Sequence, residues 1–520
     1  MTVLLRHNPE NPQTCFQKGK PTMKTLKRRG LLAKAGALLA VAALAFSASP
    51  SYAQTNDVPE TANVVITKLE QPTVAGSVAS GQSQTLPEGS KGIEDVEFTA
   101  YRVPVYKAGE NGDEHPARTS AWQQATADID LDMAKSRVAE LATPTEVALN
   151  PTNENGVTNW SAAAAGLYLI RETSTPAGVI PAQDFLLAVP MTNPEGTGWL
   201  TDIYVYPKGS TFSASKSVDN AASLKTGDPV TWTIEAGIPL IRSHTSGDPV
   251  APAEFKIVDT FNTADLELVG GANGVTVTVP GIEFVTADYT VDVNPVVDGL
   301  TTVTITFNEG GLAKLVGKDD VTVELKTTVL KAGEINTTAT ITATDDTRAT
   351  TVTDIKQTVK YGKVTLTKKN QNGQLAKDAV FRVYATEAHA KAKGDNHLIT
   401  ATNKTGIWKT GEGGKVILDG FRFSDFADGA DQVKGADGSL YQTYWLVEMT
   451  APAGQQLLAE PVPFTVTEVE DTLEVTNTAN TNAFVLPLTG GTGTAMLTIL
   501  GLGILAIVLF VARSRRNAEA

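Results

Sequence analysis

Three lysines of this chain follow apolar residues that lie two and four positions before them: Lys68, Lys216 and Lys368. Residues two apart in a β-strand share a face, so each of these amines should point into a hydrophobic core. A charged amine is costly in such a place. One lysine of this kind can extend its ammonium to the surface along its apolar stem, but three at matching positions predict buried amines.

Three carboxylates share a strand face with aromatic or aliphatic residues: Glu172, Asp259 and Glu448. Both glutamates stand in similar segments that lead into Pro-Ala-Gly, whereas Asp259 belongs to a different segment. A buried carboxylate beside a buried lysine usually forms a salt bridge. A carboxamide beside the two groups would make a further reaction possible.

Two asparagines in later strand-like segments are the candidate carboxamides. Asn477 alternates cleanly with Leu473 and Val475 on one face. Asn336 alternates less cleanly, because two threonines share its face. We therefore expect one such site around Lys216, Asp259 and Asn336, and another around Lys368, Glu448 and Asn477.

Short alternating segments separated by Gly, Pro and Asp turns fill residues 60–480, a pattern typical of β-sandwiches. The segments that open with the three lysines repeat along the chain. A length of 520 residues suggests about two to four domains. We therefore predict an all-β protein with three tandem sandwiches.

Composition narrows the function further. A net charge of -14 argues against nucleic acid as a partner. The single cysteine, Cys15, lies near the N-terminus, so the rest of the chain has no disulfide or thiol chemistry. Five scattered histidines place no histidine metal cluster and no Ser/His/Asp arrangement. We expect no cofactor and no metal site.

The N-terminal segment has the features of a secretory signal peptide. Basic residues precede an apolar run at residues 31–46, and small residues then lead to Ala53, after which cleavage is expected. Met23 is an alternative start. Arg28 and Arg29 could also belong to a twin-arginine signal, although a charged leader for export of the unfolded chain fits better.

The C-terminal segment combines a pentapeptide, an apolar run and a basic end. Residues 495–511 can cross a bilayer as one helix at about 1.5 Å of rise per residue, and the arginines after them hold the end in the cytoplasm. The pentapeptide before the run resembles the LPxTG sorting signal of Gram-positive surface proteins: Leu486, Pro487, Leu488, Thr489 and Gly490. A sortase would cut between Thr489 and Gly490. The alternative is a plain anchor helix after a turn.

The segment before Gly209 presents one further lysine. Trp199, Ile203 and Val205 share one strand face and should be core, whereas Lys208 lies on the other face. The preceding proline ends strand pairing. Lys208 is therefore expected to face outward at the junction of the first and second sandwiches, although most lysines are simply solvated.

Together these features resemble a backbone (major) pilin of Gram-positive bacteria, the fimbrial-shaft subunit that a sortase polymerises. The segment that ends at Lys208 resembles the family's pilin motif, in which the final lysine is the sortase acceptor. The segments with Glu172 and Glu448 resemble its E-box. The resemblance implies Ig-like, collagen-adhesin-type sandwiches and implies that Thr489 of one subunit is joined to Lys208 of the next.

The resemblance also implies spontaneous amide cross-links between lysine and asparagine, promoted by a buried acid. By position, Lys216 would join Asn336 with Asp259 assisting, and Lys368 would join Asn477 with Glu448 assisting. Burial lowers the pKa of a lysine and leaves a nucleophilic amine, whereas it raises the pKa of the acid, which can then polarise the carboxamide. A buried ionic cluster is the alternative at each site.

The first sandwich departs from this pattern. Lys68 and Glu172 are present, but Gly209 stands where the family can carry asparagine. Without a carboxamide there is no electrophile. We predict a salt bridge or a partly solvated Lys68 there, and no cross-link.

The predicted organisation follows from these assignments. It comprises a signal peptide (1–53), an N-terminal domain that ends in the pilin motif (54–209), a middle Ig-like domain (210–361), a C-terminal Ig-like domain (362–485) and the sorting signal with its helix and basic tail (486–520). The loop at 423–440 could hold calcium through its aspartates, but a solvated loop is favoured.

The functional prediction is a structural, non-enzymatic fimbrial subunit at the cell wall. Its expected partners are a pilin-specific sortase, other copies of itself, minor tip or base pilins and peptidoglycan; the sequence names no host receptor. The alternative is a monomeric cell-wall-anchored adhesin, which would share the leader, the sandwiches and the sorting signal.

Overall fold

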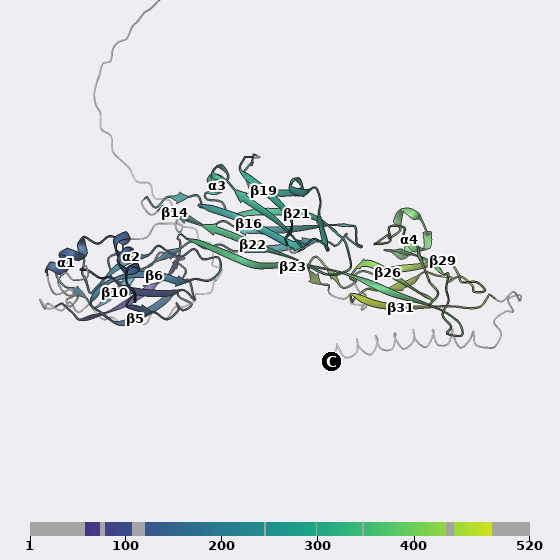
Figure 1. Ribbon diagram of the computed structural model, residues 1–520, viewed down its shortest axis with the longest axis horizontal. Helices are drawn as coiled ribbons and strands as arrows, with labels where there is room; N and C mark the ends of the chain where they lie inside the picture. The colour runs from purple at the N-terminus through teal and green to yellow at the C-terminus, as the bar shows by residue number, and fades with distance from the viewer. Residues whose placement is uncertain are drawn as a thin grey trace, which may run out of the picture. The chain divides into compact units, whose positions relative to one another are not determined.

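A computed structural model of the chain describes residues 58–72, 79–106, 120–243, 246–285, 287–297, 299–345, 348–432 and 441–480. The predicted signal peptide and the predicted sorting signal with its apolar run lie outside these ranges. Among the helices of the described ranges, none has both the length and the hydropathy that a membrane span requires. Within the described ranges, the regular secondary structure is mostly β-strand, with a few short helices (Figure 1).

The first sandwich packs two sheets around a hydrophobic core, with strand orders β10-β1-β5 and β4-β3-β6-β7. In β1, the side chains of Ala62, Val64 and Ile66 are buried in this core, because residues two apart share one face of the strand. Two short helices cover a second apolar cluster on this sandwich. Its elements are β1 (Thr61–Thr67), β2 (Leu69–Glu70), β3 (Glu97–Arg102), α1 (Ser120–Ala127), α2 (Leu131–Ala139), β4 (Glu146–Ala148), β5 (Val157–Ala164), β6 (Gly166–Ser174), β7 (Phe185–Val189), β8 (Met191–Thr192), β9 (Trp199–Leu200), β10 (Asp202–Val205) and β11 (Lys208–Gly209).

The middle sandwich consists of two packed sheets. One has the strand order β12-β13-β21-β17, and the other contains β19-β20-β16-β22-β23. Trp232 is fully buried at the centre and donates its indole N–H to Thr327 Oγ1 at 2.8 Å. The elements are β12 (Ala214–Asp219), β13 (Pro229–Gly237), β14 (Ile241–Arg242), β15 (Pro249–Val250), β16 (Glu254–Asn262), β17 (Leu266–Leu268), η1 (Gly271–Gly274), β18 (Val275–Thr278), β19 (Tyr289–Val297), β20 (Leu300–Phe307), α3 (Glu309–Leu315), β21 (Asp320–Val329), β22 (Gly333–Thr344) and β23 (Ala349–Asn370).

The third sandwich packs the C-terminal half of β23, with β26 and β31 beside it, against a sheet of order β25-β24-β29-β30. Strands β23 and β31 run parallel, from Lys363 opposite Glu470 to Asn370 opposite Asn477. The elements after β23 are β24 (Val380–Tyr384), α4 (Glu387–Ala392), η2 (Asp395–His397), β25 (Trp408–Lys409), β26 (Lys415–Arg422), β27 (Phe426–Ala427), β28 (Ala430–Asp431), β29 (Tyr444–Thr450), β30 (Val462–Phe464) and β31 (Glu470–Asn477).

Strand β23 belongs to both the middle and the third sandwich (Figure 1). It pairs with β22 through its N-terminal part and with β26 and β31 through its C-terminal part. The turn before β13 strengthens this joint, because Arg422 N donates to Leu224 O at 2.9 Å and Thr226 N donates to Gly420 O at 2.8 Å. The middle and third cores are therefore connected by continuous backbone pairing.

Two hydrogen bonds between Asn220 and Asp428 also connect the middle and third sandwiches. Asn220 N donates to Asp428 Oδ1 at 2.9 Å, and Asp428 N donates back to Asn220 Oδ1 at 2.7 Å. Asp428 lies in the β27–β28 turn, within the loop at 423–440 whose aspartates suggest calcium as a possible ligand. The second part of that loop, 433–440, lies outside the described residues, so the calcium hypothesis stays untested.

The all-β, Ig-like prediction is confirmed by this architecture. The domain boundaries stay predictions. Each hydrophobic core draws almost all its side chains from one predicted domain, but Ile180 packs into the middle core and Leu224 against the third. The predicted boundary at 361/362 falls inside β23.

Candidate functional site

The third sandwich brings Lys368, Glu448 and Asn477 together in its core. Lys368 lies in β23 opposite Val475, and Asn477 follows two residues later on β31, on the same face. Glu448 projects from β29 in the facing sheet. The three residues are 0%, 3% and 2% exposed, so the site is closed to bulk solvent.

The hydrogen bonds hold the carboxamide against the acid. Asn477 Nδ2 donates to Glu448 Oε1 at 2.8 Å and to Oε2 at 2.7 Å, and Leu458 N also donates to Oε2 at 3.0 Å. Lys368 Nζ donates to the carbonyl of Lys369 at 2.9 Å and to that of Val475 at 3.4 Å. Among the described residues, none donates to the buried Oδ1 of Asn477.

This arrangement suits attack of the lysine amine on the asparagine. Burial lowers the pKa of Lys368, although the nearby Glu448 opposes the shift, and so favours the neutral amine that can act as a nucleophile. Glu448 holds the amide nitrogen that would depart as ammonia. The acid is therefore placed at the leaving group of an amide exchange.

The middle sandwich places Lys216 of β12 against Asp259 of β16, which belongs to the facing sheet. Lys216 Nζ lies 2.5 Å from Asp259 Oδ1, and their side chains are 0% and 1% exposed. Burial lowers the pKa of Lys216 and raises that of Asp259, while the ion pair opposes both shifts. The predicted contact between this lysine and this acid is therefore present.

Asn336 does not join that pair, and the prediction of a Lys216–Asn336 cross-link is wrong in this structure. Asn336 lies on the exposed face of β22, where its Oδ1 accepts from Thr358 Oγ1 at 2.5 Å. The inward face of the strand is set by Ile335 and Ile341, so Thr337 takes the buried position. Asn336 was assigned to the wrong face because threonines occupy both faces of this strand.

Two buried oxygen atoms without hydrogen-bond partners show that no carboxamide of the described residues reaches this site. Thr337 is fully buried, and its Oγ1 has no hydrogen-bond partner among the described residues. The same holds for Asp259 Oδ2. The middle sandwich thus retains a lysine and an acid without the electrophile that a cross-link needs.

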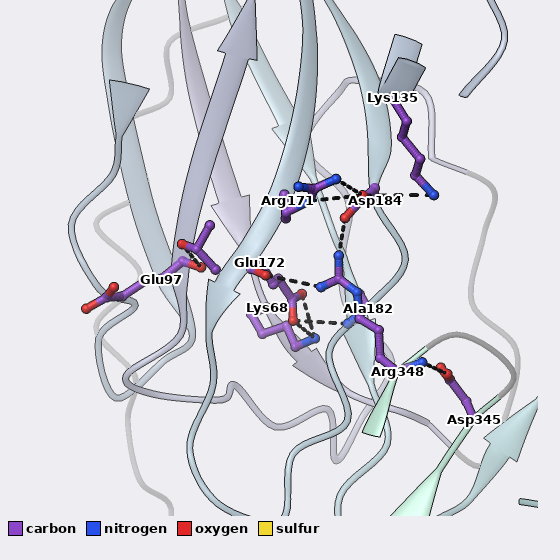
Figure 2. Close-up of polar contacts among 10 residues, drawn as sticks. Lys68, Glu97, Lys135, Arg171, Glu172, Ala182, Asp184, Asp345 and Arg348 are labelled. Atoms are coloured by element: carbon purple, nitrogen blue, oxygen red, sulfur yellow. Dashed lines mark hydrogen bonds and ion pairs between the residues drawn. The ribbon is translucent and has the colours of Figure 1, made fainter. Parts of the chain in front are cut away.

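The first sandwich contains the salt bridge that its sequence predicts. Lys68 Nζ donates to Glu172 Oε1 at 2.7 Å and to Oε2 at 2.9 Å, and Ala182 N donates to Oε2 at 3.0 Å (Figure 2). Lys68 is fully buried, which lowers its pKa despite the partner carboxylate. A Cβ added at Gly209 would lie 2.6 Å from Lys68 Nζ. Gly209 therefore occupies the place from which a third side chain would reach this amine.

Asp184 connects the first sandwich to the middle one. Its buried carboxylate accepts from Arg171 at 3.0 and 3.1 Å and also pairs with Arg348, which precedes β23 (Figure 2). Arg348 Nη1 donates in addition to the backbone carbonyl of Glu172 at 3.1 Å. No local sequence pattern predicts this joint, because Asp184 and Arg348 are 164 positions apart.

Lys208 lies in β11, opposite Leu69 of β2, and is half-buried. Together with Tyr206, it lines a groove of about 290 Å³ whose other wall includes Glu70 and Gln84. Gln84 N donates to the Tyr206 hydroxyl at 3.0 Å, which fixes that wall. Among the described residues, none forms an ion pair or a hydrogen bond with the Lys208 ammonium. Its amine therefore stands at an open groove instead of projecting freely into solvent.

Comparisons with known proteins agree with this architecture. Residues 59–210 match a family model described as Gram-positive pilin subunit D1, N-terminal domain, and residues 478–519 match the LPXTG cell wall anchor motif. The chain is 30% identical to the fimbrial subunit type 1 of Actinomyces viscosus, over 93% of this chain and 96% of that protein. The chain belongs to the Gram-positive fimbrial subunits. It is a structural subunit of a cell-surface fimbria that is anchored to the cell wall.

One further sequence match and two solved structures are also similar to this fimbrial subunit. It is 27% identical to the fimbrial subunit type 2 of Actinomyces naeslundii, over 70% of this chain and 73% of that one. The major pilin SpaD of Corynebacterium diphtheriae superposes with a TM-score of 0.62 at 21% identity, over 82% of this chain and 100% of that chain. The major pilin SpaA of the same organism gives 0.56 at 22%, over 80% and 100%.

Replacing Gly209 by asparagine should complete the site of the first sandwich. A Cβ at residue 209 would lie 2.6 Å from Lys68 Nζ and 2.9 Å from Ile180 O, so the amine and the local backbone must shift to admit the side chain. The carboxamide would then meet the Lys68 amine, and we expect an amide between Lys68 and residue 209 with loss of one ammonia molecule. Peptide mass spectrometry of Gly209→Asn would detect the joined peptides. The double variant Gly209→Asn/Glu172→Gln is the control and should keep the ammonia, and a full mass for the single variant would contradict the expectation.

Replacing Arg348 by alanine should loosen the joint between the first and middle sandwiches. The change removes a charge-assisted contact worth on the order of 1–3 kcal/mol, while Asp184 keeps Arg171 as a partner. Phe212 precedes β12, packs against the middle core and donates its N–H to Gly178 O of the first sandwich at 2.9 Å. Loosening the joint should expose this residue, so we expect faster chymotrypsin cleavage at Phe212 with both sandwiches still folded. Arg382→Ala, which removes an ion pair inside the third sandwich, should leave the rate unchanged. Equal rates for the two variants would show that Arg348 does not hold the joint.

Proposed function

We propose that this fimbrial subunit forms the shaft of the fimbria through an amide between Thr489 of one copy and Lys208 of the next. The observation that supports this most is the half-buried Lys208 amine, which lines a groove and lacks a described partner. A sortase would release the segment after Thr489 and hold the Thr489 carbonyl as a thioester. Lys208 Nζ would then attack that carbonyl and expel the sortase thiol.

This linkage produces an open polymer. The donor is the C-terminal end of one subunit and the acceptor is a groove beside β11 of another, so the two contact surfaces differ. A heterologous contact of this kind need not close into a ring and continues as a filament. Minor tip or base pilins and peptidoglycan would supply the ends of the filament.

We further propose one internal amide, between Lys368 and Asn477, promoted by Glu448. Lys368 Nζ would add to the Asn477 side-chain carbonyl, the bond to Nδ2 would break, and ammonia would leave with a proton relayed by Glu448. The fold holds the reacting groups together, which can contribute about 7–11 kcal/mol to the barrier reduction at best. The reaction occurs once per chain and is not enzymatic turnover.

Lys208→Ala should abolish polymerisation. Without the acceptor amine, the sortase thioester has no route to a second subunit, so the ladder of covalent polymers on a denaturing gel should collapse to a monomer. Lys91→Ala is a matched control, because Lys91 is exposed near the same groove and pairs only weakly with Glu70 at 3.6 Å. A wild-type ladder from Lys208→Ala would require another acceptor. A single wall-linked band from the wild type would favour the monomeric adhesin.

Peptide mass spectrometry of the expressed chain should show one internal cross-link. We expect the chain to lack one ammonia molecule and to yield joined peptides that contain Lys368 and Asn477. Glu448→Gln should restore the ammonia, because a carboxamide cannot relay the proton. Glu172→Gln changes the corresponding acid of the first sandwich and should leave the mass deficit intact. Finding Lys368 and Asn477 on separate peptides in the wild type would disprove the amide.

A further inference from the structure

The proposed linkage fixes which parts of each subunit carry tension in the fibre, and the following inference rests on it. Tension would enter a subunit at the Lys208 side chain and leave at its own Thr489. The backbone from 209 to 489 then lies in the path. The strands β1 to β10 of the first sandwich precede Lys208 and lie outside it.

The third sandwich is protected against extension in two ways. Its first and last strands, the C-terminal half of β23 and β31, pair in parallel over eight positions, so tension applied at opposite ends shears the whole ladder at once. The proposed Lys368–Asn477 amide would also connect these strands covalently. The residues between 368 and 477 would then carry no tension.

The middle sandwich has neither protection within the described ranges. Its first strand, β12, pairs with β13 in one sheet, whereas its last strand, β23, pairs with β22 in the other. No backbone ladder of the described residues joins β12 to β23. Between these two strands, Gln357 Nε2 donates to Lys216 O at 3.4 Å, which is long for a hydrogen bond.

The buried contact of β12 with the facing sheet is ionic instead of covalent. Lys216 reaches Asp259, but Asn336 faces outward and Thr337 takes the inward position. An ion pair separates under tension and can form again, whereas an amide would bypass the residues between its two ends. The middle sandwich is therefore in the tension path without a covalent bypass.

We propose that the middle sandwich is the extensible element of the fibre, which unfolds under tension while the first and third sandwiches stay folded. The expected length gain follows from the chain between Lys216 and Tyr361. About 145 residues at roughly 3.4 Å each give an extended length of about 500 Å. The corresponding segment of an unlinked third sandwich, about 108 residues, would give roughly 370 Å.

Pulling native fibres in single-molecule force spectroscopy tests this proposal. The wild-type fibre should show repeated steps of about 500 Å, less the folded length, and no step near 370 Å. Fibres of the Glu448→Gln variant should add the shorter step, because the third sandwich then lacks its amide. Wild-type fibres without the long step would overturn the proposal.

Asn336→Ala provides the matched control. Asn336 is a surface residue in this structure, so its removal should leave the folding and the long step unchanged. If Lys216 and Asn336 were joined in the fibre, the wild type would instead show a short step that lengthens in Asn336→Ala, and the proposal would fail. Peptide mapping of the same fibres identifies the inter-subunit junction, so an acceptor other than Lys208 would be recognised as a failure of the proposed linkage.

Discussion

A buried lysine beside a carboxylate of the facing sheet is the constraint on which each sandwich depends. Removing two charges from water costs several kcal/mol per ion unless hydrogen bonds satisfy them. The first and middle sandwiches meet this cost with direct ion pairs, Lys68–Glu172 and Lys216–Asp259. In the third, the acid is satisfied by Asn477. The same framework therefore differs in its third group: Gly209, Thr337 or Asn477.

Strand alternation was sufficient to predict the lysines and acids, because single charged residues stood out against apolar neighbours. It also placed Asn477, whose face carries Leu473 and Val475. It failed at β22, where threonines fill both faces and the apolar residues Ile335 and Ile341 were the informative signal. The carboxamide of Asn336 suggested a buried reactive group, although the residue lies on the exposed face of the strand.

The joints between sandwiches were beyond prediction for a different reason. Contacts such as Arg348 with Asp184 or Asn220 with Asp428 connect residues far apart in sequence, and no periodicity relates them. The two joints also differ physically. The middle and third sandwiches share the backbone of β23. The first and middle sandwiches are instead connected by the Arg348 side chain, which hydrogen-bonds to Glu172 O and pairs with Asp184.

The uninterrupted course of β23 has a consequence for recovery after stretching. When the middle sandwich unravels, the C-terminal half of this strand stays aligned with β26 and β31 in the folded third sandwich. The N-terminal half remains attached to that fixed template. As the fibre relaxes, β22 can pair again with the N-terminal half of β23, whose direction is fixed by the folded third sandwich. Refolding of the middle sandwich would therefore start at β23 and restore the original length of each subunit.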